Sequence, residues 1–240
     1  MSSKRRVSSG VQLWTPDQIS TLAWYKASDA STITVGTGGI SEWRDKSGNL
    51  NNLTQSDANK RPGYINNEVV FDGSNIDGLR FDQPINTANF NAFYVLKTSD
   101  TLVILLTRST TIYDIVGQIG STSQPVGSHY GTPTFRKNAS DVLISTRNDV
   151  YTEMCTGAYE IIHHKDADTT DTNWSTMSLC DYSAGGFNFD GSIAEIIYSS
   201  NLLSADMEKI EGYLAHEHSS FGLLEKLPIS HPYKTNPPTI

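Results

Sequence analysis

The chain has 240 residues, of which 18 are basic and 26 acidic, so its formal net charge is −8. Binding of duplex nucleic acid depends on lysines and arginines that neutralise several phosphates, so this charge excludes a broad nucleic-acid interface. Hydrophobic residues make up 37% and aromatic residues 10% of the sequence, which excludes a disordered chain. A β-rich chain of this length commonly forms one domain, and we expect one here.

The N-terminal segment, residues 1–13, is predicted to be a basic arm that carries Lys4, Arg5 and Arg6. Polar residues and Pro16 interrupt any apolar segment behind these charges, so we expect no secretory signal peptide. The longest apolar run, Leu102 to Leu106, is far shorter than the roughly 20 residues of a transmembrane helix, so no membrane insertion is expected. The arm is either solvated or an electrostatic contact to an acidic surface, including that of a second copy.

Short runs of β-branched and aromatic residues predict strands through most of the chain. In chain order the runs are 22–25, 69–71, 93–96, 102–106, 112–113, 142–144, 159–162, 177–179 and 193–198. Turn sequences such as Ser47-Gly48-Asn49 and Asp190-Gly191 separate them. The pattern predicts an all-β, antiparallel β-sandwich of the jelly-roll type over residues 14–222. Because every residue of 102–106 is apolar, we expect that run to be a central strand covered on both faces.

One segment, Ser204 to His216, has helical periodicity, with Met207, Ile210 and Leu214 on one face. We expect Ser204 to be its N-cap. Gly212 in its middle disfavours the helix, so we expect a close approach to the sheet there. Four of the nine prolines fall in the last 13 residues, which predicts an extended C-terminal strap over 223–240.

The sequence does not suggest catalytic chemistry. A glycan hydrolase needs two carboxyl groups placed close together, commonly on alternating positions of one strand, and no such pair is found. Glu195 is the nearest candidate, alone between Ile193 and Ile197 on one expected strand face. We interpret it as a buried carboxylate bonded to loop amides or to a Lys or Arg side chain. The chain is therefore not expected to be an enzyme.

Metal ligands are also sparse. His163 and His164 are adjacent on an expected strand, so they point to opposite faces and cannot share a metal. An acidic loop offers oxygen ligands from Asp166, Asp168 and Asp171, but it lacks the glycine and glutamate of a complete EF-hand. The loop is either solvated or a calcium site.

Two further features concern binding and redox state. Trp14, Trp24 and Trp43 lie in or beside apolar strands and are expected in the core, whereas Trp174, next to Asn173, has polar neighbours. Trp174 and Asn173 are therefore the candidate ligand-binding pair. Cys155 and Cys180 could form a disulfide, but free thiols are the favoured state in a domain of this size.

Four stretches resemble the laminin-G-like, concanavalin A-like jelly-roll domains of bacteriophage virion proteins and bacterial surface proteins. They run over 43–49 with Arg61-Pro62, over 70–73, over 189–198, and from 203 through the helix to the terminal prolines. The residues that we take as the structural motif are Trp43, Asp45, Ser47, Gly48, Asn49, Phe71, Asp72, Gly73, Gly191, Glu195, Glu211 and Gly212. At the helix end this chain lacks the family's tryptophan, and the stretch from 99 to 176 matches only loosely.

The resemblance implies two packed antiparallel sheets with the helix along one edge. It favours a non-enzymatic virion protein, either a capsid decoration or a tail-associated component, made in the host cytoplasm. Its expected partners are other virion proteins or copies of itself, and a host-surface polysaccharide is a further candidate. The alternatives are a stand-alone carbohydrate-binding module or lectin, with calcium as a possible cofactor, and, less favoured, a polysaccharide-degrading enzyme.

Overall fold

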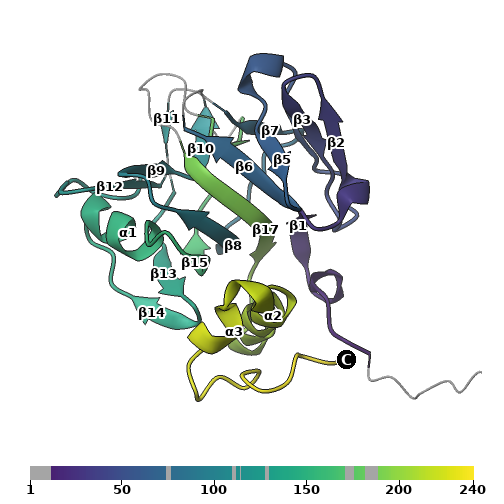
Figure 1. Ribbon diagram of the computed structural model, residues 1–240. Coiled ribbons are helices and arrows are strands. Elements are labelled where there is room, and N and C mark those ends of the chain that lie inside the picture. Colours follow the sequence, from purple (N-terminus) through teal and green to yellow (C-terminus); the bar gives the residue numbers. More distant parts are fainter. Residues whose placement is uncertain are drawn as a thin grey trace, which may run out of the picture.

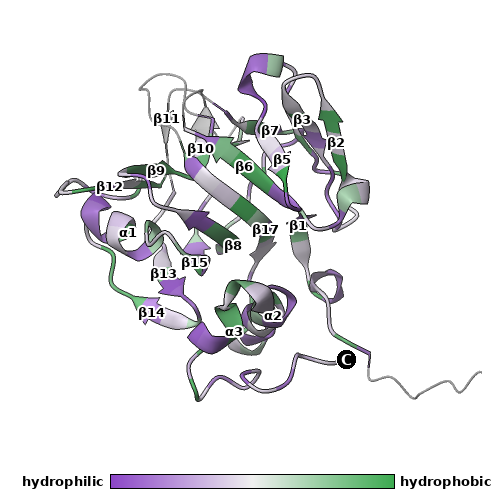
Figure 2. Ribbon diagram, in the orientation of Figure 1, coloured by the Kyte–Doolittle hydropathy of each residue, from purple (hydrophilic) through white to green (hydrophobic). Residues whose placement is uncertain are grey.

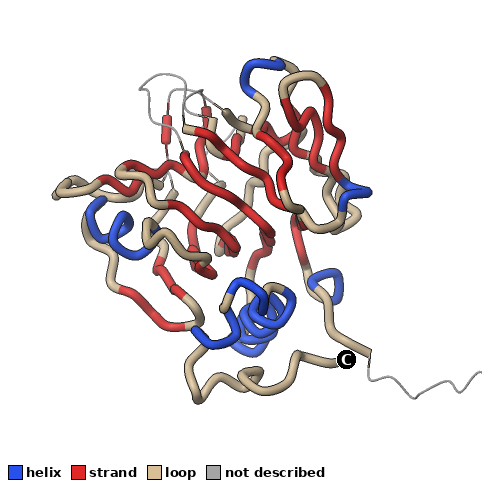
Figure 3. Tube along the Cα trace, in the orientation of Figure 1, coloured by secondary structure: helices blue, strands red, loops and turns tan. Residues whose placement is uncertain are grey.

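The computed structural model describes residues 12–73, 77–109, 112–113, 115–127, 130–170, 176–181 and 189–240. Within them the chain is mostly β, with antiparallel strand pairs throughout, which confirms the predicted all-β class (Figures 1 and 3). Helices lie at the periphery, and none in the described part is long and apolar enough to cross a membrane.

The larger sheet is built around two long neighbouring strands, β8 and β17. In spatial order it contains β14 (Ser140–Val142), β13 (Thr134–Lys137), β15 (Glu160–Ala167), β8 (Phe90–Thr98), β17 (Asp190–Ser200), β6 (Glu68–Asp72) and β5 (Gly63–Ile65). The strand β1 (Thr21–Lys26) pairs with β17 beyond the end of β6. β8 and β17 are buried along nearly their whole length because both faces of this sheet are covered.

A second sheet faces the first. It contains β11 (Ile112–Tyr113), β10 (Leu106–Ser109), β16 (Ser178–Leu179), β7 (Leu79–Phe81), β4 (Leu53–Thr54), β3 (Gly39–Trp43) and β2 (Ile33–Gly36). Side chains from both sheets, such as Trp43 and Phe71, share one core. Tyr25 from β1 lies 5.6 Å from Trp43, ring centre to ring centre, so the two sheets pack directly on each other. This arrangement is consistent with a β-sandwich.

The prediction that residues 102–106 form one central strand is wrong. The chain bends at Leu105, so that β9 (Leu102–Ile104) pairs with β12 (Val116–Gln118) in a separate two-stranded sheet, and β10 joins the second sheet. Most of the run is still buried, because Val103, Leu105 and Leu106 face the main core while Ile104 packs with Val116. An all-apolar run indicates burial on both faces but does not show where the chain passes from one sheet to the other.

Three α-helices occur in the described residues: α1 (Arg147–Met154), α2 (Ser204–Glu217) and α3 (Leu223–Lys226). Short 3₁₀ turns cover Pro16–Gln18, Ala30–Thr32, Ala58–Lys60 and Ser219–Phe221. The prediction of a single helix was therefore wrong. Helix α1 buries only Val150 and Met154, and its residues are mostly hydrophilic, so it lacks a helical apolar pattern (Figure 2). Its sequence signal was the capping box of Thr146 and Asp149.

Helix α2 was predicted correctly, but two of its details differ. Its N-cap is Leu203, and Ser204 is the first residue of the helix. No side chain makes a capping hydrogen bond there. A Cβ on Gly212 would meet Tyr233 of the C-terminal segment, not the sheet. The predicted strap also starts too early, because α3 occupies 223–226 and only the chain after it is irregular.

Helices α2 and α3 cover the outer face of the larger sheet. Met207, Ile210 and Leu214 pack with Phe93 and Ile197 in a second core, and the expected core positions of Trp14 and Trp24 are confirmed there. The molecule thus has three layers, of two sheets and a helical layer. Cys155 and Cys180 are free thiols, as favoured from the sequence.

Most structural-motif residues shape the sandwich. Gly191 has room for no side chain, since a Cβ would come within 2.3 Å of the Lys97 carbonyl oxygen. Phe71 packs edge-on against Phe189 at 5.4 Å. Gly73 takes a φ of +66° at the end of β6, and Asp72 lies opposite Asp190 in the strand register. Burial and the charges of Asp100 and Asp72 raise the pKa of Asp190.

Candidate functional site

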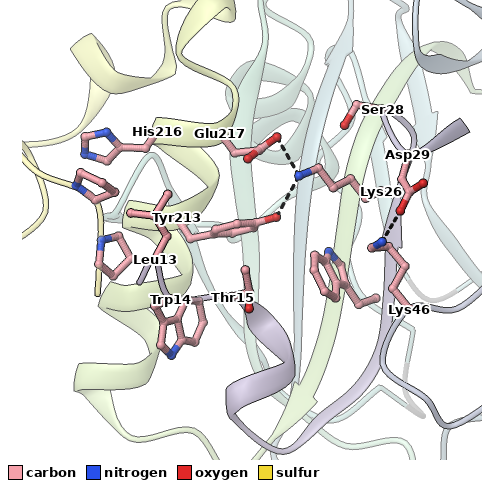
Figure 4. Close-up of a pocket in the computed structure, with 13 residues that line it drawn as sticks. Leu13, Trp14, Thr15, Lys26, Ser28, Asp29, Lys46, Tyr213, His216 and Glu217 are labelled. Atoms are coloured by element: carbon pink, nitrogen blue, oxygen red, sulfur yellow. Dashed lines mark hydrogen bonds and ion pairs between the residues drawn. The ribbon is translucent and has the colours of Figure 1, made fainter. Parts of the chain in front are cut away.

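A pocket of about 630 Å³ opens where β1, α2 and the two ends of the described chain meet (Figure 4). Its position follows from the fold, because α2 lies across the outer face of the larger sheet and Lys26, at the end of β1, stays partly exposed beside it. It is lined by Leu13, Trp14, Thr15, Trp24, Lys26, Ser28, Asp29, Lys46, Tyr213, His216, Glu217, Pro237 and Pro238. Trp24 and Lys26 are alternate residues of β1 and so share one face of the strand, and Ser28 lies in the turn that follows.

The floor of the pocket is aromatic. Tyr213 of α2 lies between two indoles, 6.1 Å from Trp14 and 6.3 Å from Trp24, with both pairs edge-on. All three side chains are more than nine-tenths buried, so only a small part of each ring borders the space. Edge-on aromatic packing fixes ring positions, so the floor is preformed.

Two ion pairs stand above this floor. Lys26 Nζ lies 2.7 Å from Glu217 Oε1 and 3.4 Å from the Tyr213 hydroxyl, and Lys46 Nζ pairs with Asp29. Figure 4 shows both pairs projecting into the same space. The two ammonium groups also cover the rings, with Lys46 5.1 Å from the centre of Trp24 and Lys26 5.7 Å from that of Tyr213. The hydrogen bonds from Lys46 and Ser31 lower the pKa of Asp29.

Glu195 lies beneath the floor and is fully buried. Its carboxyl group accepts hydrogen bonds from Trp24 Nε1 at 2.7 Å, from the Tyr213 hydroxyl at 2.9 Å and from His218 Nε2 at 2.7 Å. Burial, and then the charge of Glu195, raise the pKa of Tyr213, so this hydroxyl stays protonated as a donor. The interpretation of Glu195 as a satisfied buried carboxylate is confirmed, but its predicted partners were wrong, because indole, phenol and imidazole groups take the place of loop amides or Lys and Arg.

A β-bulge explains why the Glu195 side chain points toward Tyr213 and His218 in the helical layer. The register of β17 against β8 shifts between Ile193 and Glu195. Ala194 and Ile197 face the helical layer, whereas Ile193 faces the core between the sheets. The expectation that Ile193 and Ile197 share a face was therefore wrong, because the extra residue of a bulge breaks the period of two.

A second buried carboxyl group joins the helix to the sheet and to the C-terminal segment. Glu211 of α2 is fully buried, 2.9 Å from Arg136 Nε, 3.9 Å from His163 Nδ1 and 3.6 Å from His231 Nε2. His163 and His164 point to opposite sides of the sheet as predicted, since His163 stacks on Phe93 and His164 contacts Tyr94. The Glu211 cluster therefore holds in place the helix that forms one wall of the pocket.

Both ends of the described chain complete the pocket. Leu13 and Thr239 form an antiparallel bridge, Trp14 N donates to the Pro238 carbonyl at 3.0 Å, and Ile240 N donates to the Gln12 carbonyl at 3.1 Å. Lys234 Nζ donates to the carbonyls of residues 224, 225 and 227, at the C-terminal end of α3. The C-terminal segment is thus bonded to its own domain.

The loop that holds the motif residues Asp45, Ser47, Gly48 and Asn49, here called the motif loop, positions one pocket residue, Lys46. Asp45 accepts hydrogen bonds from the backbone amides of Trp24 at 2.9 Å, Ser47 at 2.8 Å and Asn51 at 3.1 Å. The Asn49 side chain donates to the carbonyls of β1, and Gly48 supplies a φ of +90°. The predicted turn bonding is confirmed. The loop also places Lys46 above Trp24, a role that the sequence reasoning missed.

Of the predicted ligand and metal residues, the structure describes Asp166 and Asp168, and neither lines the pocket. Trp174, Asn173 and Asp171 lie outside the described residues, as do Lys4, Arg5 and Arg6. Asp168 accepts hydrogen bonds from the amide and hydroxyl of Thr170, and Asp166 lies 3.6 Å from Lys165. Among the residues that the structure describes, no three His, Cys, Asp or Glu side chains are grouped to hold a metal ion. The calcium site, which also involves Asp171, stays a prediction.

Lys26, Lys46, Asp29, Tyr213 and Glu217 were not predicted as site residues. The alternation of Trp24 and Lys26 was the one available signal, since it marks a strand face that is partly polar. The others come from three separate segments. No model of a known protein family matches the sequence, and no curated protein matches it at a significant level.

Proposed function

We propose that the chain is a non-enzymatic accessory protein of a bacteriophage particle, a capsid decoration or a tail component, which binds carbohydrate of the host surface. The observation that carries the binding role is the pocket between β1 and α2, where aromatic side chains form the floor and paired charges the walls. Sugar rings offer apolar C–H faces and hydroxyl groups that both donate and accept, so they match such a mixed lining.

The carboxyl groups of the site favour binding over hydrolysis. A glycoside hydrolase needs one carboxyl group with a raised pKa as its proton donor. The pKa of Asp29 is instead lowered by Lys46 and Ser31. Glu195 is fully buried beneath the aromatic floor, and three donors already occupy its oxygens. Glu217, the other carboxyl group of the lining, is paired with Lys26 Nζ at 2.7 Å. Neither Asp29 nor Glu195 is placed to protonate a glycosidic oxygen.

The placement on a virion rests on the resemblance of the motif residues to jelly-roll domains of phage particles. Two of these motif residues have structural roles in this chain, because Asp45 accepts a hydrogen bond from the amide of Ser47 and a Cβ on Gly191 would meet the Lys97 carbonyl. A jelly-roll topology of the concanavalin A type is part of the same proposal. Other virion proteins, or further copies of this chain, are the proposed partners, with the basic arm of Lys4, Arg5 and Arg6 as one contact.

A glycan array probed with the full chain, with and without calcium, tests the binding role. We expect at least one host-type glycan to bind, and a D29N/K46Q double variant to lose about tenfold in affinity, because hydrogen bonds to charged groups contribute about 1.5–3 kcal/mol. The matched control is K137Q/E153Q, which removes a partly exposed ion pair far from the pocket, between β13 and α1. An array without any bound glycan would refute the proposal.

Mass spectrometry of purified particles of the encoding phage tests the placement. We expect peptides of the chain at a stoichiometry above that of contaminating host proteins. Glycan binding without presence on the particle would favour the alternative, a stand-alone carbohydrate-binding module, which the same pocket supports. Turnover of a bound polysaccharide would favour the enzyme instead.

A further inference from the structure

The geometry points to an uncharged oligosaccharide as the ligand of the pocket, in preference to acidic sugars, with the pairs Lys26–Glu217 and Lys46–Asp29 as the determinants. This inference rests on the proposed function. It adds the charge class of the ligand and the residues that select it.

Charge balance is the first support. Two ammonium groups and two carboxylates line the pocket, and each is held by a partner of opposite sign. His216, also in the lining, donates from Nε2 to the Tyr233 carbonyl at 2.8 Å. The two lysine charges are therefore balanced by the two carboxylates and do not attract an anion, and the whole chain carries a net charge of −8.

The second support is the position of each carboxylate. An acidic sugar that paired with Lys26 or Lys46 would lie beside Glu217 or Asp29, so it would either separate an existing ion pair or meet a like charge. A hydroxyl group does neither, because it donates to the carboxylate and accepts from the ammonium group at the same time. Each ion pair is thus a two-point site for a hydroxyl.

Accessibility is the third support. The side chains of Lys26 and Lys46 are 18% and 23% exposed, and those of Glu217 and Asp29 are 36% and 29% exposed. All four groups are open to a ligand and also partly shielded from water, so their interactions exceed those of fully exposed ion pairs.

The aromatic floor sets the extent of the ligand. Tyr213 lies between Trp14 and Trp24, so apolar edges continue past the width of a single ring. Lys26 lies over Tyr213 and Lys46 over Trp24, so each ion pair stands above a different part of the floor. The spacing suits at least two sugar units, one beside each ion pair.

The test is a glycan array at pH 8, where histidine side chains are ordinarily neutral. The array presents matched pairs of glycans that differ only in a carboxylate or sulfate group. Calorimetry then measures dissociation constants of the wild-type chain for the best pair. We expect the uncharged member to bind about tenfold or more tightly, since a like-charge contact or a broken ion pair accompanies the charged member.

The variants D29N and E217Q provide the decisive comparison, because each leaves a lysine without its carboxylate. We expect each to weaken binding of the uncharged glycan about fivefold and to strengthen binding of its acidic counterpart. E153Q is the control, since Glu153 pairs with Lys137 outside the pocket. Thermal melting of each variant shows whether the domain is intact, and all four groups lie at the surface, so we expect folded proteins.

The outcomes separate this inference from the proposed function. Preference for acidic glycans, or equal binding of both members, would overturn the uncharged class while the binding role stands. Unchanged discrimination in both D29N and E217Q would overturn the role of the ion pairs. An array on which no glycan binds would overturn the proposed function itself.

Discussion

Gly212 of helix α2 lies against Tyr233 of the C-terminal segment so closely that a Cβ on the glycine would come within 2.5 Å of the tyrosine Cβ. The same segment bonds to the helix through His216, whose Nε2 contacts the Tyr233 carbonyl. It also meets the buried Glu211 through His231 at 3.6 Å. A glycine in mid-helix, which disfavours the helix by itself, thus allows the chain end to pack on the helix and close the pocket wall.

We expect Gly212→Ala to destabilise the protein by about 1–3 kcal/mol, the usual effect of overpacking, even though alanine improves helix propensity by about 1 kcal/mol. Urea unfolding measures the loss, and tryptic cleavage after Lys234 reports detachment of the segment. Glu208→Ala on the same helix is the control, with a small effect on both readouts. A Gly212→Ala protein as stable and as resistant as the wild type would contradict the packing.

Glu195→Gln should lower the free energy of unfolding by about 2–4 kcal/mol. Three donors converge on the carboxyl group, from Trp24, Tyr213 and His218, and an amide replaces one acceptor oxygen with a donor. Urea unfolding followed by tryptophan fluorescence measures the loss. The partly exposed Glu153→Gln provides the matched comparison, where we expect less than about 1 kcal/mol. Equal losses in the two variants would show that Glu195 does not organise the floor.

His164→Phe should stabilise the protein by about 1–2 kcal/mol. Neither ring nitrogen of His164 has a hydrogen-bond partner, and the ring lies 5.1 Å from Phe135 and 5.3 Å from Tyr94. An apolar ring removes the penalty of a buried unpaired polar group. The neighbouring His163→Phe is the opposite control, because His163 Nε2 bonds to Asn91 Oδ1 at 2.9 Å. A stability gain in His163→Phe and a loss in His164→Phe would reverse this assignment.

Stability should fall as the pH falls below about 6.5. Burial lowers the pKa of His164 to about 3, and burial and then Arg136 lower that of His163. Between the ordinary histidine pKa of about 6.5 and the lowered pKa of each histidine in the folded protein, the unfolded chain binds protons that the folded chain does not. Over this window each histidine therefore lowers the free energy of unfolding by up to about 1.4 kcal/mol for every pH unit of acidification. Above the ordinary histidine pKa this loss of stability is absent.

Urea unfolding between pH 7 and pH 4 measures this slope. We expect the slope of His164→Phe to be shallower than that of the wild type by the share of one histidine. Identical slopes would mean that His164 titrates normally in the folded protein.

The sequence by itself determined the class of the fold and the helix α2, because these depend on local periodicity. Alternating runs predicted the strands, and the spacing of Met207, Ile210 and Leu214 predicted the helix. The turn at Asp45, Ser47 and Gly48 was equally local, since an Asp side chain bonds amides of its own loop. These features require no knowledge of distant segments.

Only the tertiary structure decided how the run 102–106 divides between two sheets, and which groups surround Glu195. Both depend on strand register, which a bend at Leu105 and a bulge before Glu195 alter without a clear sequence signal. The pocket depends still more on the tertiary structure. Lys26, Lys46 and Tyr213 come from a strand, a loop and a helix, and they meet because α2 and the chain ends pack on the outer face of the sheet.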